Sequence, residues 1–290
     1  MRLRPSLVFQ VLAALLTANF FFSRSESHGR RSFHPALRPD SALTALQMPI
    51  QPDTLGEHTR SLSVAPPLPL PVEPVVIEHG SRDEKTIALT FDACSTHDPS
   101  NYDERVSEVL IQTQTPATLF LGGKWMTEET EQTKQLAANP LFELGNHTYF
   151  HPHLREVSDE RIREELQSTQ SVMDSLTGRR AILFRPPYGE YDDRVVRIAA
   201  SLGLKTVQFD LASGDPDPAI SKERLIRYVS TMAHNGSIIV MHINRRGWHT
   251  AEALPEIITR LRQRGFVFKT VSDMLLQPAE PAHGKNNSHP

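Results

Sequence analysis

The sequence predicts an α/β domain of about seven parallel strands. These strands would form a (β/α) barrel that is either closed or incomplete, with a gap between its first and last strands. Short β-branched or aromatic runs alternate with helical patterns between residues 76 and 276, which indicates a parallel sheet covered by helices. That window of about 200 residues is long enough for a sizeable core. No glycine-rich phosphate loop follows any strand, so a nucleotide site has no support. An open doubly wound sheet is the competing architecture.

The predicted strands are short runs rich in β-branched and aromatic residues, namely Thr86–Asp92, Ala117–Gly122, Leu141–His147, Ala181–Pro186, Lys205–Asp210, Ser237–Ile243 and Phe266–Val271. The predicted helices have apolar residues at helical spacing, namely Tyr102–Gln114, Thr127–Ala138, Ser158–Leu176, Asp192–Leu202, Ser221–Ala233 and Thr250–Arg264. Gly203 and Gly265 stand just past two of these helices, where glycine commonly ends a helix.

Composition excludes several classes of protein. Of the 290 residues, 39% are hydrophobic and 22% are charged, which are the proportions of an ordinary globular protein. The formal net charge of −3 argues against a general nucleic-acid binder, which needs a basic face. Cys94 is the one cysteine, so an intrachain disulfide framework and a four-cysteine zinc site are both excluded. The 13 histidines favour imidazole and carboxylate as the ligands of any metal.

The N-terminal residues have the pattern of a targeting segment. Arg2 and Arg4 precede an apolar run from Leu7 to Phe22, which is short for a membrane span and typical of a secretory signal peptide. An uncleaved anchor is the alternative, and either one predicts an exported protein, periplasmic or secreted. The expected segments are the signal peptide or anchor over 1–25, a proline-rich linker over 26–75, the folded domain over 76–276 and a flexible tail over 277–290.

Polar residues follow the carboxyl ends of the predicted strands, which meet at one edge of a parallel α/β fold. They are Asp92, His147, His151, Arg185, Asp215 and His242. Two histidines four residues apart can bind one metal ion, and catalytic zinc typically has three protein ligands and an open position. Arg185 stands between Phe184 and two prolines, which favours a rigid guanidinium that binds a carboxylate bidentately. The convergence predicts an enzyme, although singly these residues could be solvated, in turns or in the core.

Five segments then carry a family resemblance: Thr90-Phe-Asp92, His147-Thr-Tyr-Phe-His-Pro152, Arg185-Pro-Pro-Tyr-Gly189, Ser213-Gly-Asp215 and Val240-Met-His242. Their order and spacing resemble the polysaccharide deacetylase superfamily, carbohydrate esterase family 4, whose domain is a distorted (β/α) barrel. The resemblance covers residues 85–275. It implies a metal-dependent hydrolase that removes acetyl groups from a carbohydrate, above all from N-acetylglucosamine-containing glycan, with O-acetylated xylan as a second substrate class.

The resemblance also implies a role for each residue. His147 and His151 would bind a divalent metal, above all zinc, with cobalt or nickel as alternatives. Asp92 would be the general base and Arg185 would hold it, with Asp215 supporting Arg185. The backbone N–H of Tyr188 would bind the oxyanion, and its side chain would contact substrate. His242 would be the general acid that protonates the departing amine.

The sequence departs from the family pattern at one position. The usual signature has two consecutive aspartates, of which the second binds metal, whereas this chain has Asp92-Ala-Cys94. Asp103 is the preferred replacement ligand, because it follows Asn101-Tyr102 where the first helix begins. A role for Asp103 at that helix N-terminus is equally compatible with its position. The other possibilities are Asp92 itself, Asp98, a Cys94 thiolate, or loss of the metal.

Trp248 and two further function classes complete the interpretation. Trp248 follows the sixth strand, where it could stack on a sugar or cap the barrel core. An inactive carbohydrate-binding module that has lost the metal is one alternative, and Ala93 favours it. A metal-independent cysteine hydrolase using Cys94 and a histidine is the other. The expected partner is an acetylated glycan, with no nucleic acid, and with membrane contact only through an uncleaved N-terminal segment.

Overall fold

The computed structural model describes residues 70–96 and 101–276. The predicted signal peptide, most of the predicted linker and the predicted tail lie outside these residues. Among the helices of the described residues, none combines the length and the apolar character that crossing a membrane requires.

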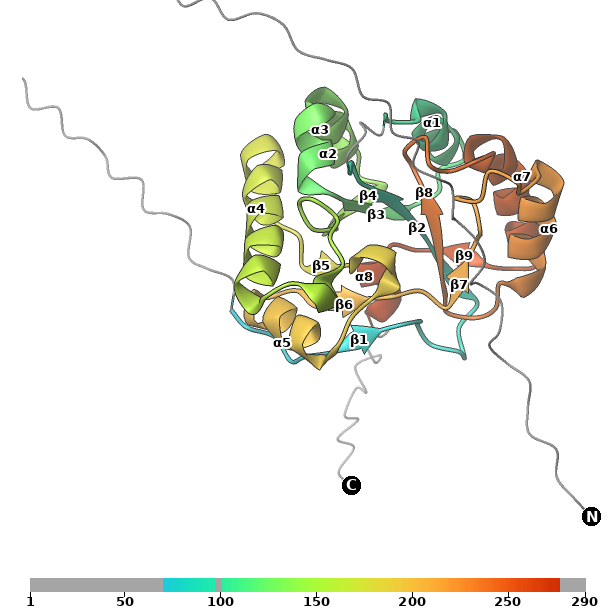
Figure 1. The fold of residues 1–290 in the computed structure, drawn as a ribbon. Coiled ribbons are helices and arrows are strands. Elements are labelled where there is room, and N and C mark those ends of the chain that lie inside the picture. The colour runs from blue at the N-terminus through green and yellow to red at the C-terminus, as the bar shows by residue number, and fades with distance from the viewer. Residues whose placement is uncertain (1–69, 97–100, 277–290) are drawn as a thin grey trace, which may run out of the picture. The chain divides into compact units, whose positions relative to one another are not determined.

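Nine strands of the described residues form one parallel sheet (Figure 1). Eight of them are neighbours in the order β1-β6-β5-β4-β3-β2-β8-β7, and β9 pairs with β2. Their bounds are β1 Val76–Ile77, β2 Thr86–Ala93, β3 Ala117–Leu121, β4 Phe142–Asn146, β5 Leu183–Phe184, β6 Lys205–Val207, β7 Leu211–Ala212, β8 Ser237–His242 and β9 Val267–Phe268.

The sheet curls into an open half-barrel, so the predicted fold class is confirmed. β1 and β7 are the two ends of the strand order and the barrel does not close between them. All seven predicted strands are present, although β5, β6 and β9 are shorter than the sequence suggested. The two strands that the sequence analysis missed, β1 and β7, have two residues each, which is too short for any alternating pattern.

Eight α-helices surround the sheet in the described residues (Figure 1). They are α1 Glu104–Gln112, α2 Gly123–Glu128, α3 Thr130–Ala138, α4 Asp159–Thr177, α5 Asp193–Ser201, α6 Lys222–Met232, α7 Thr250–Gln263 and α8 Val271–Leu275. The six predicted helices are all present, and the short helices α2 and α8 were missed. Gly203 and Gly265 have the positive φ values of 77° and 85° expected just past a helix.

The two faces of the sheet have separate apolar clusters. Ile87, Leu89 and Phe91 of β2 belong to the larger cluster, which the surrounding helices cover. Ala88 of β2 belongs to the smaller one, together with residues of β3, β5, β6, β8 and α8: Phe120, Leu183, Val207, Ile238, Val271 and Met274. Because side chains alternate along a strand, Thr90 and Asp92 continue the face of Ala88 toward the carboxyl end. The face that carries Ala88, here called the inner face, is therefore apolar near α8 and polar at the carboxyl ends of the strands.

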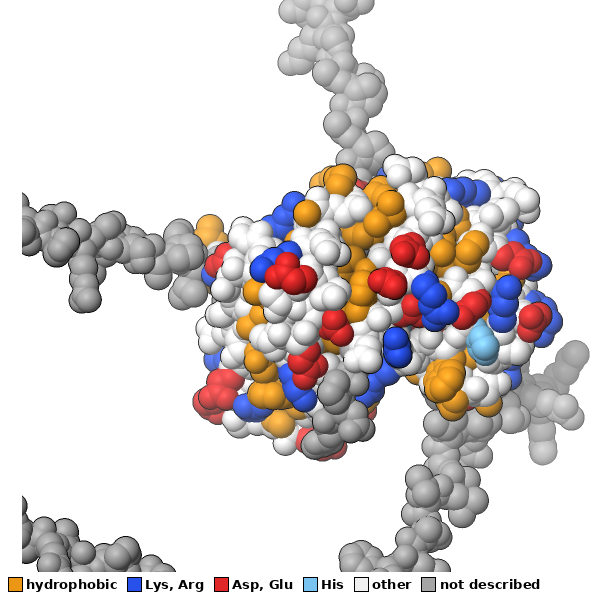
Figure 2. Space-filling model, turned by 90° about the horizontal axis from the view of Figure 1, so that it is seen from above, with side chains coloured by type: hydrophobic (Ala, Val, Ile, Leu, Met, Phe, Trp, Pro, Cys, Tyr) orange, Lys and Arg blue, Asp and Glu red, His pale blue; other side chains and the backbone are white. Residues whose placement is uncertain are grey.

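Charged side chains of both signs are interspersed with apolar ones on the face drawn in Figure 2. This face consequently has no large area of a single charge sign.

The turn before β8 depends on a glycine. Gly236 has a φ of 72°, its N–H donates to Thr86 O, and its carbonyl accepts from the Gly80 N–H. A Cβ atom there would lie 2.5 Å from the backbone oxygen of Ser81, which cannot rotate away. Glycine is required both for the left-handed conformation and for this close approach.

We expect Gly236→Ala to lower the free energy of unfolding by roughly 3 kcal/mol or more, because strain and overlap add. Gly178→Ala is the matched control, since Gly178 also has a positive φ of 65° but an added Cβ would meet nothing within 4 Å. That control should lose only about 1 kcal/mol. Urea unfolding of both variants measures the difference, and equal losses would contradict the close-approach argument.

Candidate active site

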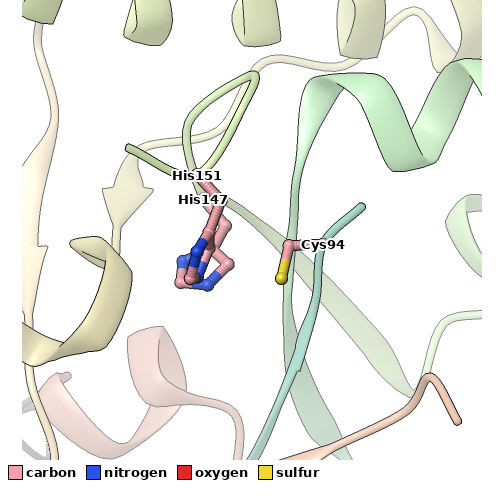
Figure 3. A group of neighbouring side chains, drawn as sticks. All are labelled: Cys94, His147 and His151. Carbon is pink, nitrogen blue, oxygen red and sulfur yellow. The ribbon is translucent and has the colours of Figure 1, made fainter. Parts of the chain in front are cut away.

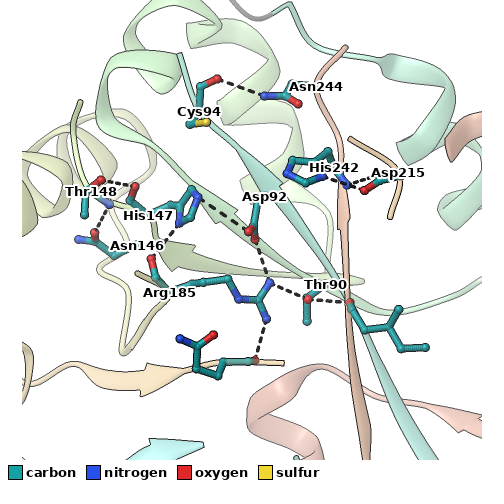
Figure 4. Close-up of polar contacts among 12 residues, drawn as sticks. Thr90, Asp92, Cys94, Asn146, His147, Thr148, Arg185, Asp215, His242 and Asn244 are labelled. Atoms are coloured by element: carbon teal, nitrogen blue, oxygen red, sulfur yellow. Dashed lines mark hydrogen bonds and ion pairs between the residues drawn. The ribbon is translucent and has the colours of Figure 1, made fainter. Parts of the chain in front are cut away.

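The carboxyl ends of neighbouring strands bring the predicted residues together (Figure 4). Asp92 lies near the end of β2, and His242 is its register partner at the end of β8. His147 follows β4 directly, and Arg185 follows β5. Together with Cys94, His151 and Tyr188, the residues Asp92, His147 and His242 line a cavity of about 390 Å³.

Arg185 is fully buried and bonds Asp92, which lines this cavity. Its guanidinium donates to Asp92 Oδ1 at 2.9 Å, to Thr90 Oγ1 at 2.7 Å and to the Gln208 carbonyl at 3.1 Å. It also lies 4.1 Å from the ring centroid of Phe120, a cation–π contact. The expectation of a bidentate bond to a carboxylate is therefore wrong. One nitrogen contacts Asp92, and the other bonds go to a threonine and a backbone carbonyl.

Asp92 is held in its ionised form. Burial opposes its ionisation, but the nearby Arg185, with His147 and His242, holds the pKa of this carboxyl below its usual range. Its second oxygen, Oδ2, lies 3.8 Å from His147 Nε2. A buried carboxylate is thus available beside the histidines as a proton acceptor.

His242 is paired with a second buried carboxylate. Its Nδ1–H donates to Asp215 Oδ1 at 2.9 Å, and its backbone N–H donates to Asp215 Oδ2 at 2.8 Å. The Thr250 and Ser213 hydroxyls also donate to Asp215. Burial works against protonation of His242, but the carboxylate of Asp215 raises the pKa of the imidazole above its usual value.

This pairing corrects the role inferred for Asp215 from the sequence. Asp215 does not support Arg185, because its described side-chain hydrogen bonds come from His242, Ser213 and Thr250 and none comes from Arg185. The carboxylate instead positions the imidazole of His242, as Figure 4 shows.

The two predicted metal ligands lie side by side with Cys94 (Figure 3). His147 Nδ1–H donates to the Arg185 carbonyl at 2.8 Å, which leaves Nε2 with a free lone pair. The ring centroids of His147 and His151 are 4.9 Å apart. One ligand atom from each of Cys94, His147 and His151 lies within 4.8 Å of the others. Imidazole and thiolate are suitable ligands for a divalent ion such as zinc.

The loop of the two histidines is held by residues that the sequence analysis missed. Buried Glu165 of α4 accepts the Tyr149 and Phe150 N–H groups, each at 2.7 Å. Asn146 Oδ1 accepts the N–H of Thr148 at 3.0 Å. Glu165 was not identifiable in advance, because the helical pattern of α4 gives no sign that one acidic residue faces this loop.

Asp103 does not join the histidines, so the preferred third ligand of the sequence analysis is corrected. Both of its carboxylate oxygens accept bonds from Arg105, at 2.8 and 2.7 Å. It precedes α1 and lines a different cavity, with Trp248. Its backbone N–H donates to Ile243 O, which holds it on that side of the sheet. Asp98 lies outside the described residues.

Trp248 and Tyr188 take different places. Trp248 is 47% exposed, so it does not cap the core, and its sugar contact stays a prediction. Tyr188 is 52% exposed and stands at the mouth of the active-site cavity, stacked on His153 with ring centroids 4.1 Å apart. His151 and Tyr188 both have a φ of 58°, and such left-handed non-glycine residues are typical of functional sites. Arg246 also lines this mouth and was not predicted.

Cys94 does not have the environment of a nucleophile. The thiol is 4% exposed, and burial raises its pKa to about 11. A thiol that keeps its proton at neutral pH is a poor nucleophile. The burial of this thiol therefore argues against the cysteine hydrolase that the sequence analysis kept as an alternative.

A curled parallel half-barrel with a buried carboxylate, a carboxylate-paired histidine and two adjacent imidazoles at its carboxyl edge defines a hydrolase-like α/β protein. The family model described as polysaccharide deacetylase matches residues 79–207. The chain is also 30% identical over 201 residues to the peptidoglycan-N-acetylmuramic acid deacetylase PdaA of Bacillus subtilis, which covers 68% of this chain and 74% of PdaA. The chain belongs to the polysaccharide deacetylase family, carbohydrate esterase family 4.

Other relatives agree with this assignment. A peptidoglycan-N-acetylglucosamine deacetylase of Bacillus cereus is 31% identical over 198 residues, covering 67% of this chain and 89% of that protein. The uncharacterized protein YlxY of Bacillus subtilis is 28% identical over 207 residues, 70% of this chain but only 61% of YlxY. The crystal structure of BA3943, a family 4 pseudoenzyme of Bacillus anthracis, superposes with a TM-score of 0.64 at 29% identity, covering 71% of this chain and 70% of that chain.

We expect Asp215→Asn to lower the pKa of His242, because the substitution removes the carboxylate that favours the imidazolium. The protonated form of His242 would then be lost at a lower pH than in the wild type. An NMR titration of the His242 ring measures the shift. Asp217→Asn is the control, since this exposed carboxylate lies in the same loop and accepts only the Ala219 N–H among its described hydrogen bonds. An unchanged His242 pKa in Asp215→Asn would contradict the pairing.

Proposed function

We propose that this chain is an exported, metal-dependent hydrolase that removes acetyl groups from a carbohydrate, with N-acetylated amino sugars of glycan chains as the leading substrate. The observation that carries the proposal is that one cavity holds two charge pairs, Arg185–Asp92 and Asp215–His242. Arg185 favours the ionised form of Asp92, and Asp215 favours the protonated form of His242 on the adjacent strand. The two environments shift the pKa values of the base and of the acid in opposite directions, which suits the hydrolysis of an amide.

The chemistry follows from these positions. A divalent ion held by His147 and His151 would polarise the acetyl carbonyl and acidify water there. Asp92 would accept the proton of the attacking water, and Arg185 would keep that carboxylate in place. His242 would donate its proton to the departing amine, which is otherwise a poor leaving group. The backbone N–H of Tyr188, at the mouth of the cavity, is the proposed donor to the oxyanion.

The substrate class is supported by the relatives. PdaA is named as acting on N-acetylmuramic acid of peptidoglycan, and the Bacillus cereus relative on its N-acetylglucosamine. A bifunctional xylanase/xylan deacetylase of Cellvibrio japonicus, 29% identical over 188 residues, supports O-acetylated xylan as the second class. Export is proposed from the basic and apolar pattern of residues 1–25 alone.

An inactive carbohydrate-binding module is the second candidate function. Ala93 in place of the family's second aspartate favours it, and so does the similarity to the pseudoenzyme BA3943. A variant of BA3943 is described as having restored enzymatic activity, so in that relative substitution recovers the lost activity. Against this candidate, burying two carboxylates with their partners is costly, and sugar binding alone does not need a matched acid and base.

We expect Asp92→Asn to lower kcat/KM for acetate release by about 10²–10⁴, because the amide cannot accept a proton. The measurement is acetate release from N-acetylglucosamine oligomers and from peptidoglycan fragments by the full chain, before and after chelation and metal reconstitution. Glu252→Gln is the control, since exposed Glu252 pairs with Arg105 in the neighbouring cavity and should leave turnover unchanged.

Two results would overturn parts of the proposal. Normal turnover in Asp92→Asn would remove Asp92 from the role of base. A wild-type protein that binds the glycans but releases no acetate after reconstitution would establish the binding module instead.

A further inference from the structure

We propose that Cys94 is the third protein ligand of the metal, as the thiolate that a coordinated divalent ion would produce by displacing the thiol proton. The site is then Cys–His–His where the family pattern has a carboxylate. The inference rests on the proposed function in requiring that the site binds a divalent ion and that Asp92 is the base. It concerns which atoms of this chain hold that ion.

The end of β2 turns Cys94 toward the two histidines. Ala93 is fully buried in the larger apolar cluster, so its side chain points away from the cavity. Side chains alternate at this point, and Asp92 and Cys94 both line the active-site cavity. Position 93 is thus used for core packing here, and the next residue supplies a side chain to the site.

The backbone on both sides of Cys94 is fixed by hydrogen bonds. The Gly122 N–H donates to Ala93 O at 2.8 Å, and Asn244 Nδ2 donates to Cys94 O at 3.1 Å. Gly122 stands just after β3, and a Cβ atom there would lie only 3.3 Å from the Ala93 carbonyl oxygen, so the absence of a side chain eases this approach. The sulfur is therefore held at a defined place beside the histidines (Figure 3).

The ligand atoms are close enough to share one ion. They lie within 4.8 Å of one another, and tetrahedral zinc with ordinary bond lengths needs sulfur and nitrogen roughly 3.5 Å apart. Small side-chain rotations bridge that difference. His147 is prepared as a ligand, since its Nδ1–H is bound to the Arg185 carbonyl, an arrangement that orients metal-binding histidines in many proteins.

An unpartnered nitrogen points to the same conclusion. His151 is 9% exposed, and its Nδ1 atom is buried with no hydrogen-bond partner. Buried polar atoms are nearly always paired in folded proteins, so each exception needs an explanation. A metal ion that accepts the lone pair of His151 Nδ1 supplies the missing partner.

The competing carboxylates are otherwise engaged. Arg105 occupies both oxygens of Asp103. Asp92 Oδ1 accepts from Arg185, and its role as the base requires that its other oxygen stay free for water. Cys94 is the described side chain of the cavity that is left to complete three protein ligands, the usual number in catalytic zinc sites.

The test uses the full chain loaded with Co²⁺ in place of Zn²⁺. A thiolate bound to Co²⁺ gives a sulfur-to-metal charge-transfer band in the near ultraviolet. Cys94 is the only cysteine of the sequence, so in the wild type this band can come from no other residue. We expect the band with about one ion per chain, and we expect Cys94→Ala to weaken metal affinity at least ~10-fold.

Cys94→Asp is the matched variant, which we expect to keep bound Co²⁺ but to lose the band. Stoichiometric Co²⁺ binding by the wild type without the band would overturn the inference, and this result does not depend on any variant folding. An unchanged affinity in Cys94→Ala would overturn it as well.

The two proposals fail separately. A thiolate band with no acetate release would support the Cys94 ligand and remove the proposed function. Chelator-sensitive acetate release without a thiolate band would keep the proposed function and remove Cys94 from the site.

Discussion

The buried guanidinium of Arg185 is the interaction on which the active site depends. One cation contacts Asp92, the Thr90 hydroxyl, a backbone carbonyl and the face of Phe120, and its own carbonyl positions His147. A buried charge is tolerated only when it is paired and hydrogen-bonded, so these partners have to be present together. Arg185 lies where the apolar part of the inner face, represented by Phe120, meets the polar carboxyl edge with Asp92.

A second charge pair, Asp215 and His242, lies on the β8 side of Asp92, and the two pairs favour opposite protonation states. Arg185 favours the unprotonated state of Asp92, whereas Asp215 favours the protonated state of His242. The parallel sheet brings the two pairs together, because strands far apart in sequence place their carboxyl ends at one edge. Opposite environments at the paired positions Asp92 and His242 allow one cavity to hold both an acid and a base.

This chain departs from the family pattern at the metal position but has both charge pairs. It lacks the second aspartate of that pattern, and a pseudoenzyme is among its structural relatives. Position 93 is compatible with alanine because its side chain packs into the larger apolar cluster, under the helices. The next residue along the chain, Cys94, lines the cavity beside the two histidines, so the loss of one ligand does not by itself remove the place for an ion.

The sequence by itself determined the fold class, the long strands and helices, and the strand-end residues, because periodicity and strand-end position are local properties. It did not determine the two-residue strands β1 and β7, which only their neighbours define. The tertiary structure alone decided that Asp215 serves His242, that Asp103 faces Arg105 and that Cys94 lies beside the histidines. Those choices depend on strand order, on where each strand ends and on which partner lies across the site, and none of these is a local property of the sequence.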